Sequence, residues 1–116
     1  MKTGTDLVNE AKTRIEEVAP KDALAIHGRN GVVFLDVREQ NEVNLGKIPG
    51  AVHIARGSLE NKVEAVLPRD AQVIVYCGGG SRSALATDTL RQMGYKARSL
   101  AGGFRGWAEA GGDIDG

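Results

Sequence analysis

Three short runs of β-branched and aliphatic residues constrain the fold of this chain more than any other feature. They are VVFLDV (Val32–Val37), AVHIA (Ala51–Ala55) and QVIVYC (Gln72–Cys77), and glycine, proline or charged residues bound each one. Because these runs are nearly continuously apolar rather than alternating, they predict strands buried on both faces, as in a parallel sheet covered by helices. Lys96–Leu100 and the short piece Glu17–Ala19 are weaker strand candidates.

Helical patterns lie between these runs. The first is an apolar face formed by Leu7, Val8, Ala11, Ile15 and Val18. We expect Asp6 to cap the helix that carries this face. The other predicted helices are Lys21–Gly28, opened by Pro20, then Glu39–Leu45, Leu59–Leu67, Arg82–Met93 and Phe104–Ala110. Alternating strands and helices predict one α/β domain, and 116 residues suffice for a core without disulfide or metal staples.

Charge and cysteine content exclude several classes of protein. Lys and Arg together number 15, as do Asp and Glu, so no basic excess indicates nucleic acid binding. A single cysteine cannot form an internal disulfide, which favours a cytoplasmic, reducing environment. Acidic residues in the first 16 positions are untypical of a signal peptide, and no apolar run is long enough for a membrane. We therefore expect a soluble protein without a membrane partner.

That cysteine lies in an unusual loop. Cys77 ends a predicted buried strand, and Gly78, Gly79 and Gly80 separate it from Ser81, Arg82 and Ser83, where a helix is expected to begin. Ligands of open α/β sheets bind at the carboxyl ends of strands, and helix N-termini attract anions. Glycines without Cβ atoms let successive backbone N–H groups turn toward one anion. Together with Arg82, this environment predicts a Cys77 thiolate, the nucleophilic form of the side chain.

A purely structural role for the loop is the alternative interpretation. A lone cysteine is as often a small buried hydrophobe, and a glycine run can form an ordinary turn. The combination of strand end, glycines, hydroxyls and arginine within one short loop favours catalysis or anion binding instead.

Three motifs resemble those of the single-domain rhodaneses. Cys77-Gly-Gly-Gly-Ser-Arg82 is similar to their Cys-x-x-Gly-x-Arg active-site loop. Asp36-Val-Arg-Glu39, followed by Glu42 and by Gly46-Lys-Ile-Pro-Gly-Ala51, is similar to their DVRE…E…GHIPGA signature, with Lys47 in place of His. Leu100-Ala-Gly-Gly103, with Trp107 and Gly111, resembles their closing motif. The match runs from about Val18 to Gly111, and three motifs in order are far more specific than one.

The resemblance implies a rhodanese-like α/β fold with about five parallel strands flanked by helices on both faces. It divides the chain into an N-terminal helical extension (1–16), a rhodanese-like domain (17–111) and a flexible tail (112–116). It also implies a sulfurtransferase in which Cys77 takes sulfane sulfur from a small anionic donor such as thiosulfate. The resulting persulfide would pass sulfur to cyanide, a thiol or a protein acceptor, with no metal or organic cofactor. We expect a monomer or a weak dimer.

Residues outside the cysteine loop are expected to have supporting or structural roles. The family likeness suggests that Asp36, Arg38 and Glu42 support the loops, with Arg38 pairing Glu42 or another carboxylate. We expect Arg56 either to line the pocket mouth or to be a solvated surface arginine. Neither histidine, His27 nor His53, has a second ligand at metal-binding spacing, so no zinc site is predicted. Trp107 was expected to pack the last helix against the sheet.

Three other functions compete with sulfur transfer. Cysteine-dependent phosphatases and arsenate reductases also use a Cys–loop–Arg anion site, but their pattern is Cys-x5-Arg, whereas four residues separate Cys77 from Arg82. A dithiol redox mechanism needs a resolving cysteine, which this chain does not supply. The third is a persulfide relay or binding module that serves a protein partner.

Overall fold

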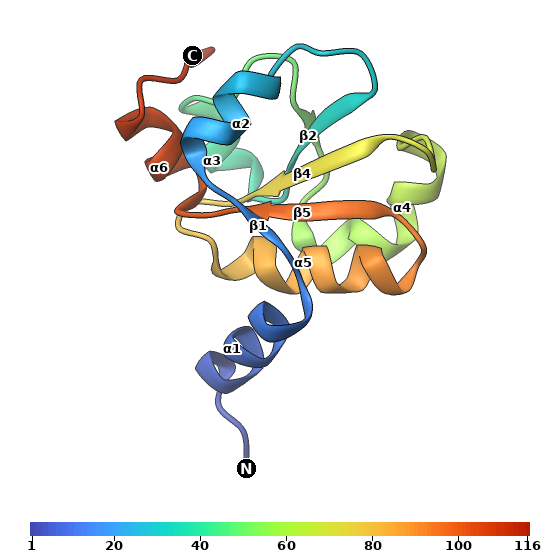
Figure 1. Ribbon diagram of the computed structural model, residues 1–116. Coiled ribbons are helices and arrows are strands. Elements are labelled where there is room, and N and C mark those ends of the chain that lie inside the picture. Colours follow the sequence, from blue (N-terminus) through green and yellow to red (C-terminus); the bar gives the residue numbers. More distant parts are fainter.

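Five parallel strands form a single sheet in the computed structural model, which describes residues 1–116 (Figure 1). The strands are β1 (Glu17–Val18), β2 (Val32–Asp36), β3 (Val52–His53), β4 (Gln72–Tyr76) and β5 (Lys96–Leu100), in the spatial order β1-β5-β4-β2-β3. The helices are α1 (Gly4–Arg14), α2 (Pro20–Ile26), α3 (Gln40–Asn44), α4 (Leu59–Val66), α5 (Ser81–Gln92) and α6 (Gly103–Glu109), with a 3₁₀ turn at Arg56–Ser58. The predicted five-stranded parallel α/β fold is confirmed.

Two hydrophobic layers hold the helices to opposite faces of the sheet. Alternate residues of one strand point to opposite faces, so Val73 and Val75 of β4 join the layer under α4 and α5. Ile74 and Tyr76 join the layer under α2 and α6. All four residues are fully buried, which explains why β4 is continuously apolar in sequence. Trp107 of α6 lies within the second layer, as expected, with its ring 5.6 Å from that of Phe34.

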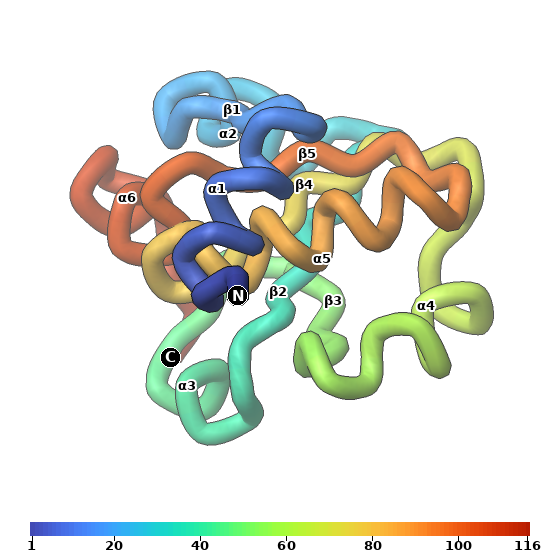
Figure 2. Tube along the Cα trace, turned by 90° about the horizontal axis from the view of Figure 1, so that it is seen from below, coloured from blue at the N-terminus to red at the C-terminus, as the bar shows by residue number.

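Helix α1 lies outside the sheet layers, against α5 (Figures 1 and 2). Ala11 is its buried residue, and Arg14 pairs with Asp88 of α5 at 2.7 Å. The predicted cap at Asp6 is wrong: Thr3 is the N-cap, and the Asp6 carboxylate accepts the backbone N–H of Thr3 in a reciprocal capping box. The helix starts earlier because this pair of hydrogen bonds satisfies both end groups at once.

The apolar face of α1 differs from its prediction, and residues of the predicted tail contact the rest of the chain. Val18 belongs to β1, not to the apolar face of α1, and Leu7 stays 48% exposed, so only part of that face is buried. Residues 112–116 were expected to form a flexible tail. Asp115 nevertheless exchanges two backbone hydrogen bonds of 2.9 Å with Lys47, and their flexibility stays a prediction. None of the helices combines the length and apolar character that a bilayer crossing requires.

Candidate active site

Three strands end at the same edge of the sheet, and residues of all three predicted motifs therefore lie close together there. Cys77 directly follows β4, Asp36 ends β2, and Gly103 lies just beyond β5. The register of the parallel strands determines these positions, since Asp36 of β2 is paired with Tyr76 of β4. The carboxyl edge of the sheet is where α/β folds collect ligands, so the architecture supports a site here.

The sulfur of Cys77 lies among hydrogen-bond donors. Its Sγ accepts the backbone N–H groups of Gly80 at 3.1 Å and of Ser83 at 3.3 Å, and the Ser83 hydroxyl lies 3.4 Å away. Cys77 itself is only 1% exposed. Donors grouped around one sulfur stabilise negative charge there, and this grouping is the arrangement that a thiolate or persulfide anion requires.

Two opposing effects act on the pKa of Cys77. Burial raises the pKa because it removes water from the charged form. Hydrogen bonds from the Ser83 hydroxyl and from the N–H groups of Ser83, Gly80 and Gly79 lower it and prevail, so the pKa of Cys77 lies below its ordinary value. The loop therefore favours the nucleophilic form of the side chain.

A second buried serine orients the first. Ser99 of β5 donates its hydroxyl to the Ser83 Oγ at 2.9 Å, and both residues are fully buried. Because Ser83 accepts from Ser99, its own proton is free to point toward the Cys77 sulfur. Ser99 was not among the residues predicted from the sequence. The available signal was a hydroxyl residue near the end of the predicted strand Lys96–Leu100, otherwise an apolar or basic run.

Two glycines give the loop its shape. Gly80 has φ +110°, a conformation that residues with side chains rarely adopt, and it precedes the first turn of α5. A Cβ at Gly103 would overlap the backbone of Cys77 and Gly78. This close approach lets Phe104 donate its N–H to the Cys77 carbonyl at 2.7 Å. The carbonyls of Cys77 and Gly78 are thus bonded to α6, which holds the loop in place. In this conformation the N–H groups of Gly80 and Ser83 point toward the sulfur.

Arg82 reaches a carboxylate rather than open solvent. Its two terminal nitrogens donate to the Glu42 oxygens at 2.6 and 2.9 Å. Hydrogen bonds from Arg82 lower the pKa of Glu42 to about 2, against a partial opposing effect of burial. The pKa of Arg82 is raised, first by Glu42 and also by the nearby Cys77 sulfur. Arg82 therefore lies between an acidic partner and the candidate nucleophile.

Arg38 has a different partner, Asp36. Its Nη2 donates to Asp36 at 2.7 Å and to the Gly46 carbonyl at 2.7 Å. The guanidinium lies 4.4 Å from the Phe104 ring centre and 5.6 Å from that of Tyr76. Burial lowers the pKa of Arg38, but the bonds to Asp36 prevail and raise it. Of the two expectations for Arg38, the structure shows the pairing with another carboxylate and not that with Glu42.

The remaining predicted residues lie around this arrangement. Gly79 and Ser81 are exposed, and Gly78 is half-buried, with its carbonyl bonded to the N–H of Arg105 at 3.2 Å. Arg56 bonds to Glu60 at 3.0 Å and to Thr89 of α5 at 3.3 Å, so it braces α4 and α5.

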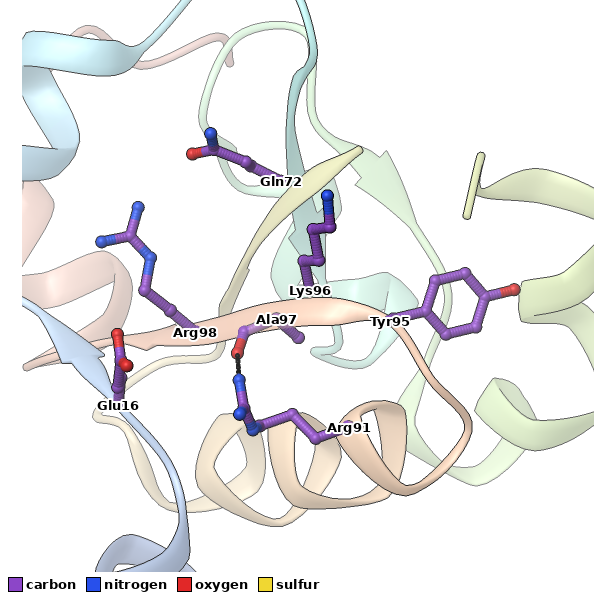
Figure 3. Close-up of a pocket in the computed structure, with 7 residues that line it drawn as sticks. All are labelled: Glu16, Gln72, Arg91, Tyr95, Lys96, Ala97 and Arg98. Carbon is purple, nitrogen blue, oxygen red and sulfur yellow. Dashed lines mark hydrogen bonds between the residues drawn. The ribbon is translucent and has the colours of Figure 1, made fainter. Parts of the chain in front are cut away.

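Cavities and potential metal ligands lie apart from Cys77. His27 and His53 each hydrogen-bond a backbone carbonyl oxygen, at 2.8 and 2.7 Å. No group of three or more His, Cys, Asp or Glu side chains is placed to hold a metal ion. Two surface cavities occur, and Cys77 lines neither. His27 is among the residues that line one of them. The other has a volume of about 340 Å³ and lies at the end of the sheet opposite Cys77, where β4 and β5 begin (Figure 3).

Comparison with known proteins agrees with this geometry. The family model for the rhodanese-like domain matches residues 19–110. A human thiosulfate:glutathione sulfurtransferase is 34% identical over 90 residues, which cover 66% of this chain and 78% of that protein. A tRNA sulfurtransferase of Desulfurococcus amylolyticus is 39% identical over 72 residues, 62% of this chain but only 14% of that longer protein.

A solved structure resembles the whole chain, including α1. It is a Rhodopseudomonas palustris protein of unknown function, described as a possible tyrosine phosphatase. It is 36% identical, with a TM-score of 0.91, and the match covers 99% of this chain and 96% of that one. The N-terminal extension is therefore shared with at least one relative.

Proposed function

The chain belongs to the rhodanese-like domain family and has a sulfurtransferase role, and from this premise we propose that it transfers sulfane sulfur through a persulfide on Cys77. The proposed donor is thiosulfate or a similar anion, and the proposed acceptor is cyanide or a thiol. The observation that carries the proposal is the Cys77 sulfur surrounded by the N–H groups of Gly80 and Ser83 and by the Ser83 hydroxyl.

The reaction would have two steps. In the first, the Cys77 thiolate attacks the sulfane sulfur of thiosulfate, a sulfur–sulfur bond forms, and sulfite leaves with the electron pair of the bond that breaks. In the second, cyanide or a thiolate attacks the outer sulfur of the persulfide, and Cys77 leaves as a thiolate. Both forms of the enzyme carry a negative charge on sulfur, which the donors of the loop stabilise.

Several assignments support these steps. Arg82 would attract the anionic donor, while Gly78, Gly79 and Ser81 shape the rim of the loop. Asp36, Arg38 and Glu42 would position these groups without touching the substrate. The human relative, by its name, uses thiosulfate and glutathione, which favours a thiosulfate-like donor and a thiol acceptor for this chain. We also propose that residues 17–111 form the catalytic domain and that 1–16 form an accessory helix.

A protein acceptor is an alternative form of the same chemistry. The Desulfurococcus relative is named for a tRNA substrate, and this chain matches only a small part of it. The persulfide on Cys77 would then supply a partner protein rather than a small thiol. Turnover with cyanide, compared with transfer to a candidate partner, separates the two forms.

Phosphatase activity is a second candidate because of the description of the Rhodopseudomonas protein. The loop disfavours it here, since four residues between Cys77 and Arg82 form a smaller ring than the five of Cys-x5-Arg enzymes. We expect hydrolysis of p-nitrophenyl phosphate by the wild type to be no faster than by Cys77→Ala. A clear difference between the two would favour the phosphatase.

Intact mass spectrometry tests the main proposal. After incubation with thiosulfate, the wild type should gain the mass of one sulfur atom, and cyanide should remove it. Cys77→Ala should gain nothing, whereas Lys62→Gln, at an exposed position of α4 outside the loop, should behave like the wild type. No gain on the wild type would rule out thiosulfate as the donor and would favour a persulfide supplied by a protein.

A further inference from the structure

A positively charged groove lies at the start of β4 and β5, at the opposite end of the sheet from Cys77. It has a volume of about 340 Å³, and Glu16, Gln72, Arg91, Lys96 and Arg98 are among the residues that line it (Figure 3). Three of them are cations and one is a carboxylate. The groove is thus locally basic in a chain whose 15 basic and 15 acidic side chains balance overall.

The three cations have no acidic partner within the chain. The ion pairs of the structure involve other arginines and lysines, and none includes Arg91, Lys96 or Arg98. The Arg91 guanidinium donates to the backbone carbonyl of Ala97 at 3.4 Å, which leaves most of its donors unused. Unpaired cations gathered in one groove produce a local positive potential that attracts anions.

The groove exists because β1 is short. β1 pairs with β5 only at Ser99 and Leu100, so the first half of β5 has no neighbouring strand on that side. The Arg91 side chain crosses this edge, and Ala97 is fully buried behind it. Because the Arg91 side chain is bonded to the Ala97 carbonyl at this edge, a partner would contact side chains here rather than add a strand to the sheet.

The spacing of the cations matches an extended peptide. Lys96 and Arg98 are two residues apart on one strand, and both project to the same side as Gln72, which lies opposite Lys96 (Figure 3). Residues two apart on a strand are separated by about 6.6 Å. Acidic side chains at alternate positions of an extended segment have that same separation, so each could face one of the two cations.

We propose that this groove binds an extended acidic segment of a partner protein. Carboxylates at alternate positions of the segment would pair with Lys96 and Arg98, while Arg91, which reaches the edge of β5 from the α5 side, adds to the positive charge there (Figure 3). The groove and Cys77 lie at opposite ends of β4, about 16 Å apart along the strand, so a docked partner leaves the cysteine loop free. Docking does not depend on persulfide chemistry, and its test is separate from that of the proposed function.

Fluorescence anisotropy with a labelled peptide of alternating Glu and Thr residues tests the proposal at low ionic strength. The double variant Lys96→Gln, Arg98→Gln should bind it about fivefold more weakly, because two exposed ion pairs are lost. Lys21→Gln, Lys62→Gln removes the same charge from exposed positions of α2 and α4, and should bind like the wild type. Cys77→Ala should also bind normally, even if sulfur transfer to small acceptors proves absent.

Three results would overturn the proposal. One is an equal loss of affinity in the two double variants, which would indicate only a general charge effect. Another is equal binding of a peptide of the same composition with its Glu residues contiguous, since the spacing would then be irrelevant. The third is binding of pyrophosphate or of a short DNA duplex, dependent on Lys96 and Arg98, in the absence of peptide binding.

Discussion

Arg38 and Arg82 each pair with a carboxylate at the carboxyl edge of the sheet, yet their surroundings differ sharply. The Arg38 and Asp36 side chains are 5% and 0% exposed, and a carbonyl and two aromatic rings surround the guanidinium. The Arg82 and Glu42 side chains are 40% and 33% exposed, with the Cys77 loop beside them. One pair is buried within the fold, and the other lies at the entrance to the candidate site.

We propose that this difference separates a positioning role for Arg38 from a binding role for Arg82. A buried guanidinium bonded to a buried carboxylate cannot leave its partner without a large desolvation cost, so Arg38 would hold the loop after β2 in place. A half-exposed pair exchanges partners at little cost, because water replaces each lost contact. Arg82 can therefore turn from Glu42 toward an incoming anion, and Arg38 cannot. Burial of the pair, rather than the arginine itself, distinguishes the two roles.

The largest expected effect is the loss of stability when the buried pair is broken. Asp36→Ala leaves the Arg38 charge buried without its partner and should lower the free energy of unfolding by about 3–5 kcal/mol. Glu42→Ala breaks the exposed pair and also the capping bond from the Glu39 N–H, and should cost about 1–2 kcal/mol. Urea denaturation of both variants measures the two losses. Losses of similar size would remove the distinction between the pairs.

The second effect concerns sulfur transfer. Arg82→Ala should lower kcat/KM for thiosulfate about tenfold, equivalent to roughly 1.4 kcal/mol of transition-state stabilisation, with little change in stability. Arg82→Lys keeps the charge but loses the two-pronged geometry, so it should restore only part of the activity. Steady-state kinetics with cyanide as acceptor provide the measurement. An unchanged kcat/KM would mean that Arg82 only holds the loop through Glu42.

Local patterns of this chain can be predicted from the sequence, whereas the partners of its arginines cannot. Continuous apolar runs identified the buried strands, and the glycine–hydroxyl loop identified Cys77, because both are local patterns. The partner of Arg82 lies 40 positions away, and the direction of a guanidinium depends on the backbone of both segments. Ser99 was missed for the same reason. Its relation to Cys77 exists only once β5 lies beside β4.

Ser99 provides the third prediction, a change in the titration of Cys77. Ser99→Ala removes the bond that orients the Ser83 hydroxyl, and should raise the pKa of Cys77 because the hydroxyl then stabilises the thiolate less well. Thr87 is the matched control, since its buried hydroxyl on α5 has no hydrogen-bond partner, and Thr87→Val should leave the pKa unchanged. The rate of alkylation by iodoacetamide as a function of pH reports the pKa. Equal shifts in both variants would indicate a general packing effect.

The smallest effect is the contribution of the exposed pair to stability at low pH. Hydrogen bonds from Arg82 lower the pKa of Glu42 from an ordinary 4.5 to about 2, so the folded state favours the charged form. The stabilisation is present above pH 4.5 and is lost as the pH falls toward 2. It should stay below about 1 kcal/mol, because both side chains contact water. The difference in unfolding free energy between the wild type and Glu42→Gln should thus be constant near neutral pH and shrink as the solution is acidified. A difference that persists at pH 2 would show that Glu42 holds Arg82 by packing, in the manner of the buried pair, and not by charge.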